Sequence, residues 1–68
     1  MATTVKIIEV IGSSEKSWED AAMNAVKDAE ESLRNIVGID VMKQTAKVEN
    51  GKIIRYKTTV KIAFEVER

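Results

Sequence analysis

The chain has 68 residues and a mass of 7.6 kDa, which fits one small domain spanning residues 1–68. Its residues are 44% hydrophobic and 32% charged, which is typical of a globular protein. Eleven basic and eleven acidic residues give a net charge of zero, which disfavours a dedicated nucleic-acid-binding module. No apolar run approaches the roughly 18 residues of a membrane span. From the charge balance we expect no nucleic acid as a partner, and from the short apolar runs we expect no membrane. The N-terminus lacks an apolar signal segment, and a cytoplasmic location is expected.

The small size predicts self-association. A lone domain of this length buries only about 60% of its unfolded surface, and disulfides, metals or oligomerisation commonly supply the missing stability. The chain has no Cys and no His. We therefore expect a homo-oligomer.

The first predicted element is a strand over residues 3–11, rich in β-branched side chains. Val5, Ile7 and Ile11 face one way, and Ile8 and Val10 face the other. A strand that is apolar on both faces is expected to be covered on both. Gly12 is expected to end this strand in a turn.

A helix is predicted over residues 18–36. Ser17 is its expected N-cap, with Asp20 as a capping-box partner. Gly38 is expected to form the left-handed C-terminal cap. The apolar positions recur at helical spacing and include four alanines, so the helix should lie close to the surface it covers: Trp18, Ala21, Ala22, Ala25, Val26, Ala29, Leu33 and Ile36.

The last two predicted elements form a hairpin, with strands over residues 39–48 and 53–67 joined at Asn50-Gly51. A two-residue turn predicts six facing pairs: Glu49 with Lys52, Thr45 with Tyr56, Gln44 with Lys57, Val41 with Val60, Asp40 with Lys61, and Ile39 with Ile62. The final strand should turn seven residues inward: Ile54, Tyr56, Thr58, Val60, Ile62, Phe64 and Val66.

These elements define an α+β fold of order β-α-β-β. The first and second strands are parallel, and the last strand lies between them, antiparallel to both, in a split β-α-β arrangement packed on one helix. A fifteen-residue strand spans about 50 Å, whereas a nineteen-residue helix spans about 28 Å. The helix therefore cannot cover the whole three-stranded sheet, which again favours a homo-oligomer.

Catalytic constellations are not apparent, since the usual general base and thiol nucleophile are missing. Ser13, Ser14 and Ser17 are best interpreted as loop and cap residues. Trp18 is interpreted as core or interface packing, with a stacking platform for a planar ligand as the alternative. Five carboxylates on the helix are interpreted as a solvated face, or alternatively as a hard-cation site shared between subunits: Glu19, Asp20, Asp28, Glu30 and Glu31.

The predicted pairing gives the sheet a polar, basic face directed away from the helix. It would carry Gly38, Asp40, Met42, Gln44 and Ala46 together with Arg55, Lys57, Thr59 and Lys61. Solvent or a neighbouring subunit is one interpretation of this face, and the wall of a pocket for a small anionic ligand is the other.

The sequence resembles the dodecin family over nearly its full length. The similar segments are Lys6–Ser14, the helix start Ser17-Trp18-Glu19-Asp20-Ala21, Ala25-Val26, Ala29, the Val48–Lys52 hairpin, Tyr56 and Val60–Val66. The resemblance implies a hollow homododecamer that binds flavins in stacked pairs between subunits. Such proteins are storage or buffering proteins and not enzymes.

Two positions depart from the family pattern. Flavin-binding members carry a stacking tryptophan where this chain has Gly38, and a hydrogen-bonding glutamine where it has Lys57. Some dodecins without that tryptophan are associated with calcium. The resemblance thus leaves two readings open: a storage dodecin for FMN or riboflavin with Gly38, Gln44, Lys57, Asp40 and Arg55 as ligand-binding candidates, or a flavin-free dodecin that binds calcium or acts as a structural shell.

Overall fold

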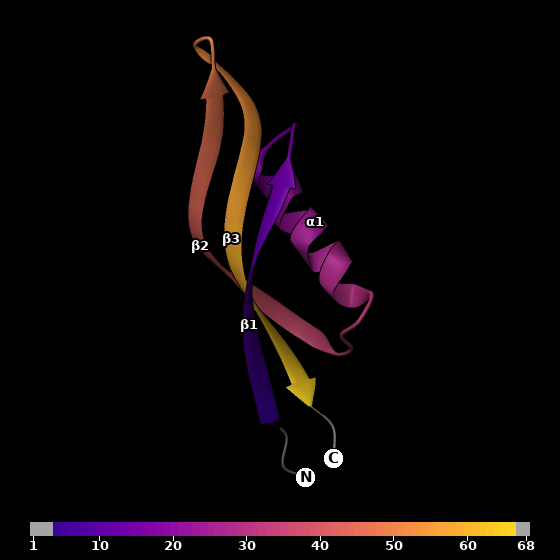
Figure 1. The fold of residues 1–68 in the computed structure, drawn as a ribbon. Coiled ribbons are helices and arrows are strands. Elements are labelled where there is room, and N and C mark those ends of the chain that lie inside the picture. Colours follow the sequence, from indigo (N-terminus) through magenta and orange to yellow (C-terminus); the bar gives the residue numbers. More distant parts are fainter. Residues whose placement is uncertain (1–3, 67–68) are drawn as a thin grey trace.

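The computed structural model describes residues 4–66 and contains one helix and three strands (Figure 1). The predictions at Thr3 and Glu67 lie outside the described residues. The elements follow the predicted order β-α-β-β: β1 (Thr4–Ser14), α1 (Trp18–Glu30), β2 (Ile36–Glu49) and β3 (Lys52–Val66).

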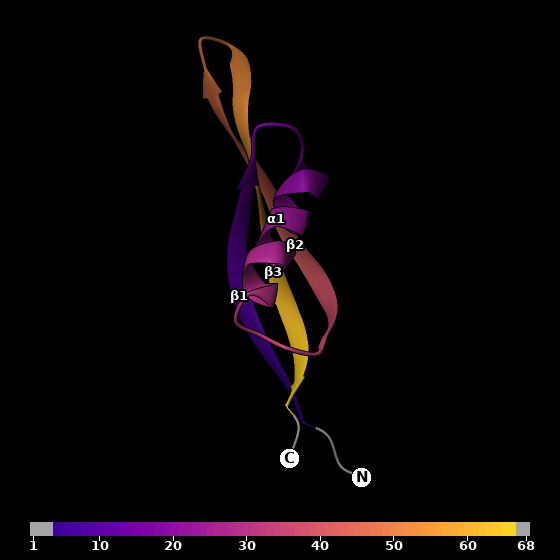
Figure 2. The same cartoon turned by 90° about the vertical axis from the view of Figure 1, so that its right-hand side faces the viewer.

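The three strands form one sheet in the order β1-β3-β2. β3 pairs antiparallel with both neighbours, so β1 and β2 are parallel to each other, as predicted. The molecule measures 54 × 20 × 12 Å, and its length is that of the sheet. A thirteen-residue helix spans only about 20 Å, so the β2–β3 hairpin projects beyond it, as Figure 2 shows.

The core lies between α1 and the centre of the sheet. Ala25 and Ala29 of the helix pack against Val60 and Ile62 of β3, both of which have no exposed surface. Val10, Ala22, Leu33 and Ile36 surround this cluster. The small alanine side chains let the helix axis approach the sheet closely, as the alanine stripe predicted.

Gly12 does not end β1, contrary to expectation. The strand continues to Ser14, and Gly12 pairs with Thr58 in the middle of the sheet. A Cβ atom at Gly12 would lie 2.0 Å from the backbone oxygen of Ala21 and 2.9 Å from the Cβ of Ala25. The glycine is therefore needed for close helix–sheet packing rather than for a turn.

The helix begins as predicted and ends six residues early. The Ser17 hydroxyl accepts a hydrogen bond of 3.0 Å from the Asp20 amide. The predicted reciprocal capping box is absent, because the Asp20 carboxylate accepts a 2.6 Å bond from the Ser14 hydroxyl instead. At the other end the Ala29 carbonyl accepts from the amides of Ser32 and Leu33, which closes the last turn.

The predicted helix cap at Gly38 is also wrong. Asn35 has the left-handed backbone (φ 62°), its carbonyl accepts from the Glu65 amide, and β2 starts at Ile36. Leu33 and Ile36 still pack against the core. Their helical spacing was misleading, because pairing with β3 satisfies the backbone of residues 36–38 in place of a further helical turn.

The hairpin turn and the outer parts of its register are confirmed. Asn50 and Gly51 have φ values of 53° and 75°, as a type I′ turn requires. The confirmed facing pairs are Glu49 with Lys52, Val41 with Val60, Asp40 with Lys61, and Ile39 with Ile62.

Two irregularities displace the middle of the hairpin by one residue. Register shifts lie between Lys47 and Val48 and between Val41 and Lys43. Consequently Thr45 faces Lys57 and not Tyr56, while Gln44 faces Thr58 and not Lys57. A shift of one residue moves each side chain to the other face of the sheet, and the second shift restores the predicted pairing.

The sheet thus has two faces, since directly opposed residues share a face. The helix face carries Val10, Thr58, Val60 and Ile62 under α1. The other face, called the open face below, carries Ile7, Glu9, Ile11 and Ser13 of β1 with their partners on β3 and β2: Asp40, Lys43, Thr45, Lys47, Arg55, Lys57, Thr59, Lys61 and Ala63, together with Gly38.

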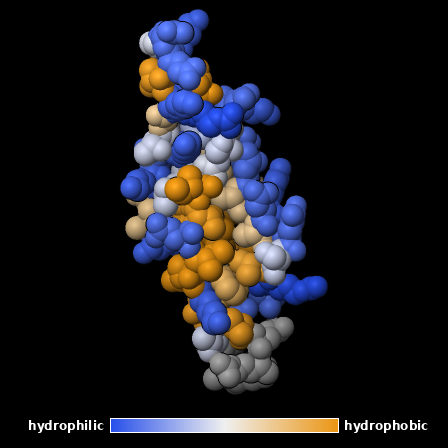
Figure 3. Space-filling model, in the orientation of Figure 1, coloured by the Kyte–Doolittle hydropathy of each residue, from blue (hydrophilic) through white to orange (hydrophobic). Residues whose placement is uncertain are grey.

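Much apolar surface is exposed on this narrow molecule. Ile7 and Ile11 are 62% and 66% exposed, and they lie on the open face. Figure 3 shows hydrophobic side chains gathered along β1, with a second group near the hairpin tip. Other exposed large apolar residues lie on β2 and β3: Val37, Ile39, Val41, Met42, Val48, Ile53 and Ile54. Contiguous apolar surface of this kind is typical of an interaction interface.

Candidate functional site

The open face is built from rows of three residues, one from each strand. Ile7, Ala63 and Gly38 form one row, and the next joins Glu9, Lys61 and Asp40. In that second row the central lysine faces a carboxylate on each side, a favourable cross-strand arrangement.

Towards the hairpin tip the open face becomes basic. Lys43 faces Thr59, Thr45 faces Lys57, and Lys47 faces Arg55. Ile11 and Ser13 extend the first two of these rows onto β1. The charged side chains of this face are therefore acidic and basic around Lys61 and basic alone from Lys43 to Lys47, where the exposed apolar side chain of Ile11 also lies. The exposed apolar pair Val48 and Ile53 follows towards the tip.

Gly38, Asp40 and Lys57 lie on one face, as predicted, but not at one place. Gly38 pairs with Ala63, six residues from Lys57 along β3. At about 3.3 Å per residue, Gly38 and Lys57 of the same chain are roughly 20 Å apart. Nothing lies within 4 Å of a Cβ atom built on Gly38, so the open face is unobstructed there.

Gln44 is placed differently from the prediction. Because of the register shift it faces Thr58 and lies on the helix face, next to Ala46 and Tyr56 rather than next to Lys57. Met42 lies at the shift itself, and Ala46 also belongs to the helix face. Gln44 and Lys57 of one chain therefore do not line a common surface. The displacement has no local signal in the sequence.

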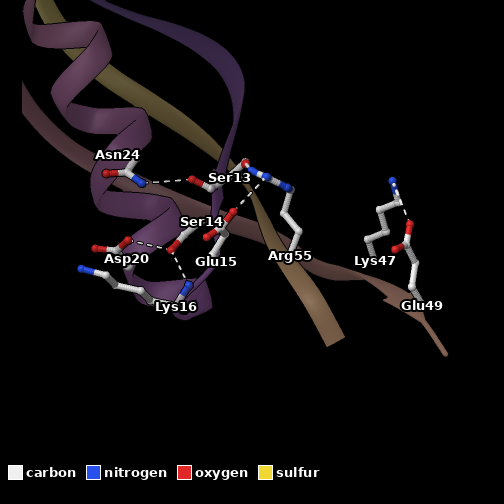
Figure 4. Close-up of polar contacts among 9 residues, drawn as sticks. All are labelled: Ser13, Ser14, Glu15, Lys16, Asp20, Asn24, Lys47, Glu49 and Arg55. Carbon is white, nitrogen blue, oxygen red and sulfur yellow. Dashed lines mark hydrogen bonds and ion pairs between the residues drawn. The ribbon is translucent and has the colours of Figure 1, made fainter. Parts of the chain in front are cut away.

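Arg55 binds back to β1 and the loop that follows it. One guanidinium nitrogen donates a 3.0 Å hydrogen bond to the Ser13 hydroxyl, and the other lies 3.4 Å from a Glu15 oxygen (Figure 4). Ser13 also offers its backbone oxygen to the Asn24 amide, at 3.0 Å. Through Ser13 these contacts connect the hairpin, β1 and α1.

On the helix face of the sheet, Trp18 connects the start of α1 to the hairpin. Its indole N–H donates a 2.7 Å hydrogen bond to the Thr45 carbonyl, and its own carbonyl accepts from the Thr58 hydroxyl at 2.8 Å. The rings of Trp18 and Tyr56 meet edge to face at 4.8 Å and 80°. This packing was the preferred interpretation of Trp18. The hydrogen bond to Thr45 was not foreseen, because it depends on the shifted register.

The acidic residues of α1 do not converge on one point. No group of three or more carboxylates that could hold a metal occurs within residues 4–66. Asp20 is engaged by Ser14, whereas Glu19, Asp28, Glu30 and Glu31 are exposed. In the described part of the chain no helix is long and apolar enough to cross a membrane.

A small β-α-β-β domain with a bare, partly basic sheet face and exposed apolar strands has the surface expected of a subunit in a larger assembly. Comparison with known proteins agrees. The sequence matches the family profile named Dodecin over residues 4–67. It is 34% identical over 61 residues to the calcium dodecin of Mycobacterium tuberculosis, covering 90% of this chain and 86% of that protein.

Solved structures give the same result. The dodecin of Streptomyces coelicolor superposes with a TM-score of 0.93 at 27% identity, covering 97% of this chain and 94% of that one. A crystal structure of the calcium dodecin of Mycobacterium tuberculosis, described as calcium-chelating and with a novel calcium-binding site, has a TM-score of 0.82 at 35% identity, covering 94% and 91%. The chain belongs to the dodecin family.

Proposed function

We propose that this dodecin is a non-enzymatic binding and storage protein that acts as a hollow homododecamer in the cytoplasm. The observation that carries the proposal is the exposed apolar surface along β1 and the projecting hairpin, with Ile7 and Ile11 as its most exposed members on the open face. A chain of this size gains stability by burying such surface against copies of itself. Closed symmetry then encloses the open faces of the subunits.

The ligand site would be completed by neighbouring subunits. Gly38 and Lys57 of one chain lie three rows apart on the open face. A small ligand that touches both positions must take them from two chains. Of the remaining predicted ligand-binding residues, Asp40 lies next to Gly38 and Arg55 lies next to Lys57 on the open face, whereas Gln44 lies on the helix face and would not share this site.

Flavin is the first candidate ligand, as the family resemblance implies. FMN or riboflavin would lie on the unobstructed surface at Gly38. Because this position is a glycine, it supplies no aromatic ring to stack on the flavin. A fluorescence titration of FMN and riboflavin with the purified protein tests this version. Quenching that saturates at micromolar ligand supports it, and fluorescence that stays that of free flavin rejects it.

Calcium is the second candidate, favoured by one relative, the calcium dodecin of Mycobacterium tuberculosis, which is 34% identical in sequence and whose crystal structure is described as having a novel calcium-binding site. The exposed carboxylates of α1, with Glu30 and Glu31 at its end, would serve as oxygen ligands where two subunits meet. The melting temperature should then rise when calcium replaces EDTA, because a ligand specific to the native state stabilises it. An unchanged melting temperature at millimolar calcium would reject this version.

A further inference from the structure

The turn at the tip of the β2–β3 hairpin is Asn50-Gly51, the one Asn-Gly sequence in the chain. Both residues are exposed, and the tip extends beyond the helix (Figure 2). Nothing lies within 4 Å of a Cβ atom built on Gly51, and among residues 4–66 its amide donates no backbone hydrogen bond. The Asn50 side chain forms no hydrogen bond with this part of the chain either. Both groups are therefore open to water and unengaged.

An asparagine followed by glycine rearranges without a catalyst. The glycine nitrogen gives up its proton to water or hydroxide and attacks the side-chain carbonyl carbon of the asparagine. A new C–N bond closes a five-membered succinimide ring, the bond to the side-chain nitrogen breaks, and ammonia leaves. Water then opens the ring at either carbonyl, which gives aspartate or isoaspartate, with no oxidation or reduction. Glycine permits the attack best, because it has no side chain to shield its nitrogen.

The turn itself delays this reaction. Ring closure needs the Gly51 nitrogen and the Asn50 Cβ on the same side of the bond between the α-carbon and the carbonyl carbon of Asn50. Asn50 has the left-handed backbone of a type I′ turn (φ 53°), which places these two atoms on opposite sides. The turn must therefore open before the ring closes. Such opening is local and needs little free energy, because neither residue buries an apolar side chain.

The other two asparagines of the chain are held where this reaction is hindered. Asn24 lies within α1, its side-chain nitrogen donates a 3.0 Å hydrogen bond to a β1 carbonyl, and the buried Ala25 follows it. Asn35 shares the left-handed backbone (φ 62°), but its carbonyl accepts a 3.0 Å bond from the Glu65 amide. The next residue, Ile36, is β-branched and packs against the core. The structure thus sets Asn50 apart from both.

We propose that Asn50 is a modification site, where spontaneous deamidation through a succinimide with Gly51 alters the hairpin turn. Isoaspartate carries the backbone through its side-chain carbon, which adds one atom to the chain between Glu49 and Lys52, the pair that closes the turn. A two-residue type I′ turn has no room for that atom, so the tip must rearrange. Either product also places a second carboxylate next to Glu49.

Peptide mapping by mass spectrometry, after incubation of the full-length protein in warm, mildly alkaline buffer, follows all three asparagines in one sample. The same protein unfolded in guanidinium chloride gives the reference rate for an open turn. In the folded protein Asn50 should convert about ten- to a hundredfold more slowly than in that reference, because the turn is open only part of the time. Asn24 and Asn35 should stay intact while half of Asn50 converts.

Gly51→Asn is the informative variant, because asparagine also tolerates the left-handed backbone but carries a side chain beside its nitrogen. It should slow the conversion of Asn50 at least tenfold. Asn50→Asp is the control for charge, since it adds the carboxylate and keeps the two-residue turn. Incubated protein that contains isoaspartate should melt at a lower temperature than Asn50→Asp.

Three results would overturn the proposal: Asn50 intact after about a hundred half-times of the unfolded reference, faster conversion of Asn24 or Asn35, or an unchanged rate in Gly51→Asn. Equal melting of the incubated protein and Asn50→Asp would overturn the effect on the turn. If Gly51→Asn fails to fold, as judged by circular dichroism, the comparison of the three asparagines decides. The reaction needs neither flavin nor calcium, so its failure would leave the proposed function standing.

Discussion

The α-carbon of Gly12 on β1 lies so close to α1 that an added methyl group would sit 2.0 Å from the backbone oxygen of Ala21. Backbone at that distance cannot move aside as a side chain does. The close approach places Ala25 over Val60 and Ile62, where the core is formed. One backbone-to-backbone contact therefore sets the spacing between the two layers.

Replacing Gly12 by Ala should lower the free energy of unfolding by about 1–3 kcal/mol, because the helix must shift away from the sheet. Urea unfolding followed by circular dichroism, at one protein concentration, measures the change. Gly38→Ala is the matched control, since nothing lies within 4 Å of its new methyl group. Equal effects of the two substitutions would contradict the packing role of Gly12.

Replacing Trp18 by Phe removes the indole N–H that donates to the Thr45 carbonyl while keeping an aromatic ring against Tyr56. We expect a loss of about 0.5–1.5 kcal/mol in the free energy of unfolding, the usual net value of one hydrogen bond. Far-ultraviolet circular dichroism is the proper signal, because the substitution removes the only tryptophan. A variant as stable as the parent would show that this bond does not hold the hairpin.

Replacing Gly38 by Trp should strengthen flavin binding, since the resemblance to flavin-binding dodecins assigns a stacking ring to this position. An aromatic pair adds about 0.5–1.5 kcal/mol, which corresponds to a roughly 2- to 10-fold lower dissociation constant for each ring. Fluorescence titration with FMN measures the change, with Gly38→Ala as control. An affinity unchanged from that of Gly38→Ala would mean that flavin, if bound at all, lies elsewhere.

Replacing Ile7 by Glu should impair self-association, because it puts a charge into the exposed apolar surface of the open face. A buried, unpaired carboxylate is strongly unfavourable in an interface. Size-exclusion chromatography with light scattering should detect smaller species. Ser32→Glu adds the same charge at an exposed position after α1 and should leave the assembly intact. Full assembly of both variants would exclude Ile7 from the interface.

Features of the fold that depend only on residues close together in the sequence were predicted correctly. Asn50-Gly51 predicted the turn, because both residues adopt positive φ values there. Ser17 predicted the helix start, since its hydroxyl satisfies a free backbone amide. The alternation along β3 predicted the buried centre of the strand, where Thr58, Val60 and Ile62 are the largest fully buried side chains, but Ile54 is exposed and Thr59, predicted to face outward, is buried.

Features that depend on distant contacts were missed. Gly12 has the composition of a turn residue, and only the position of Ala21 reveals its packing role. The shift at Met42 exchanges the faces of Lys43 and Gln44 without any local cue. Of the five predicted ligand-binding residues, Gln44 is therefore on the helix face, and the other four share the open face.

Native mass spectrometry of the protein, purified without added ligand or chelator, tests the central claim most directly. Twelve chains of 7.6 kDa give an assembly of about 91 kDa. We expect that mass, with any excess identifying flavin or calcium as the bound ligand. A monomer of 7.6 kDa as the main species would contradict the account.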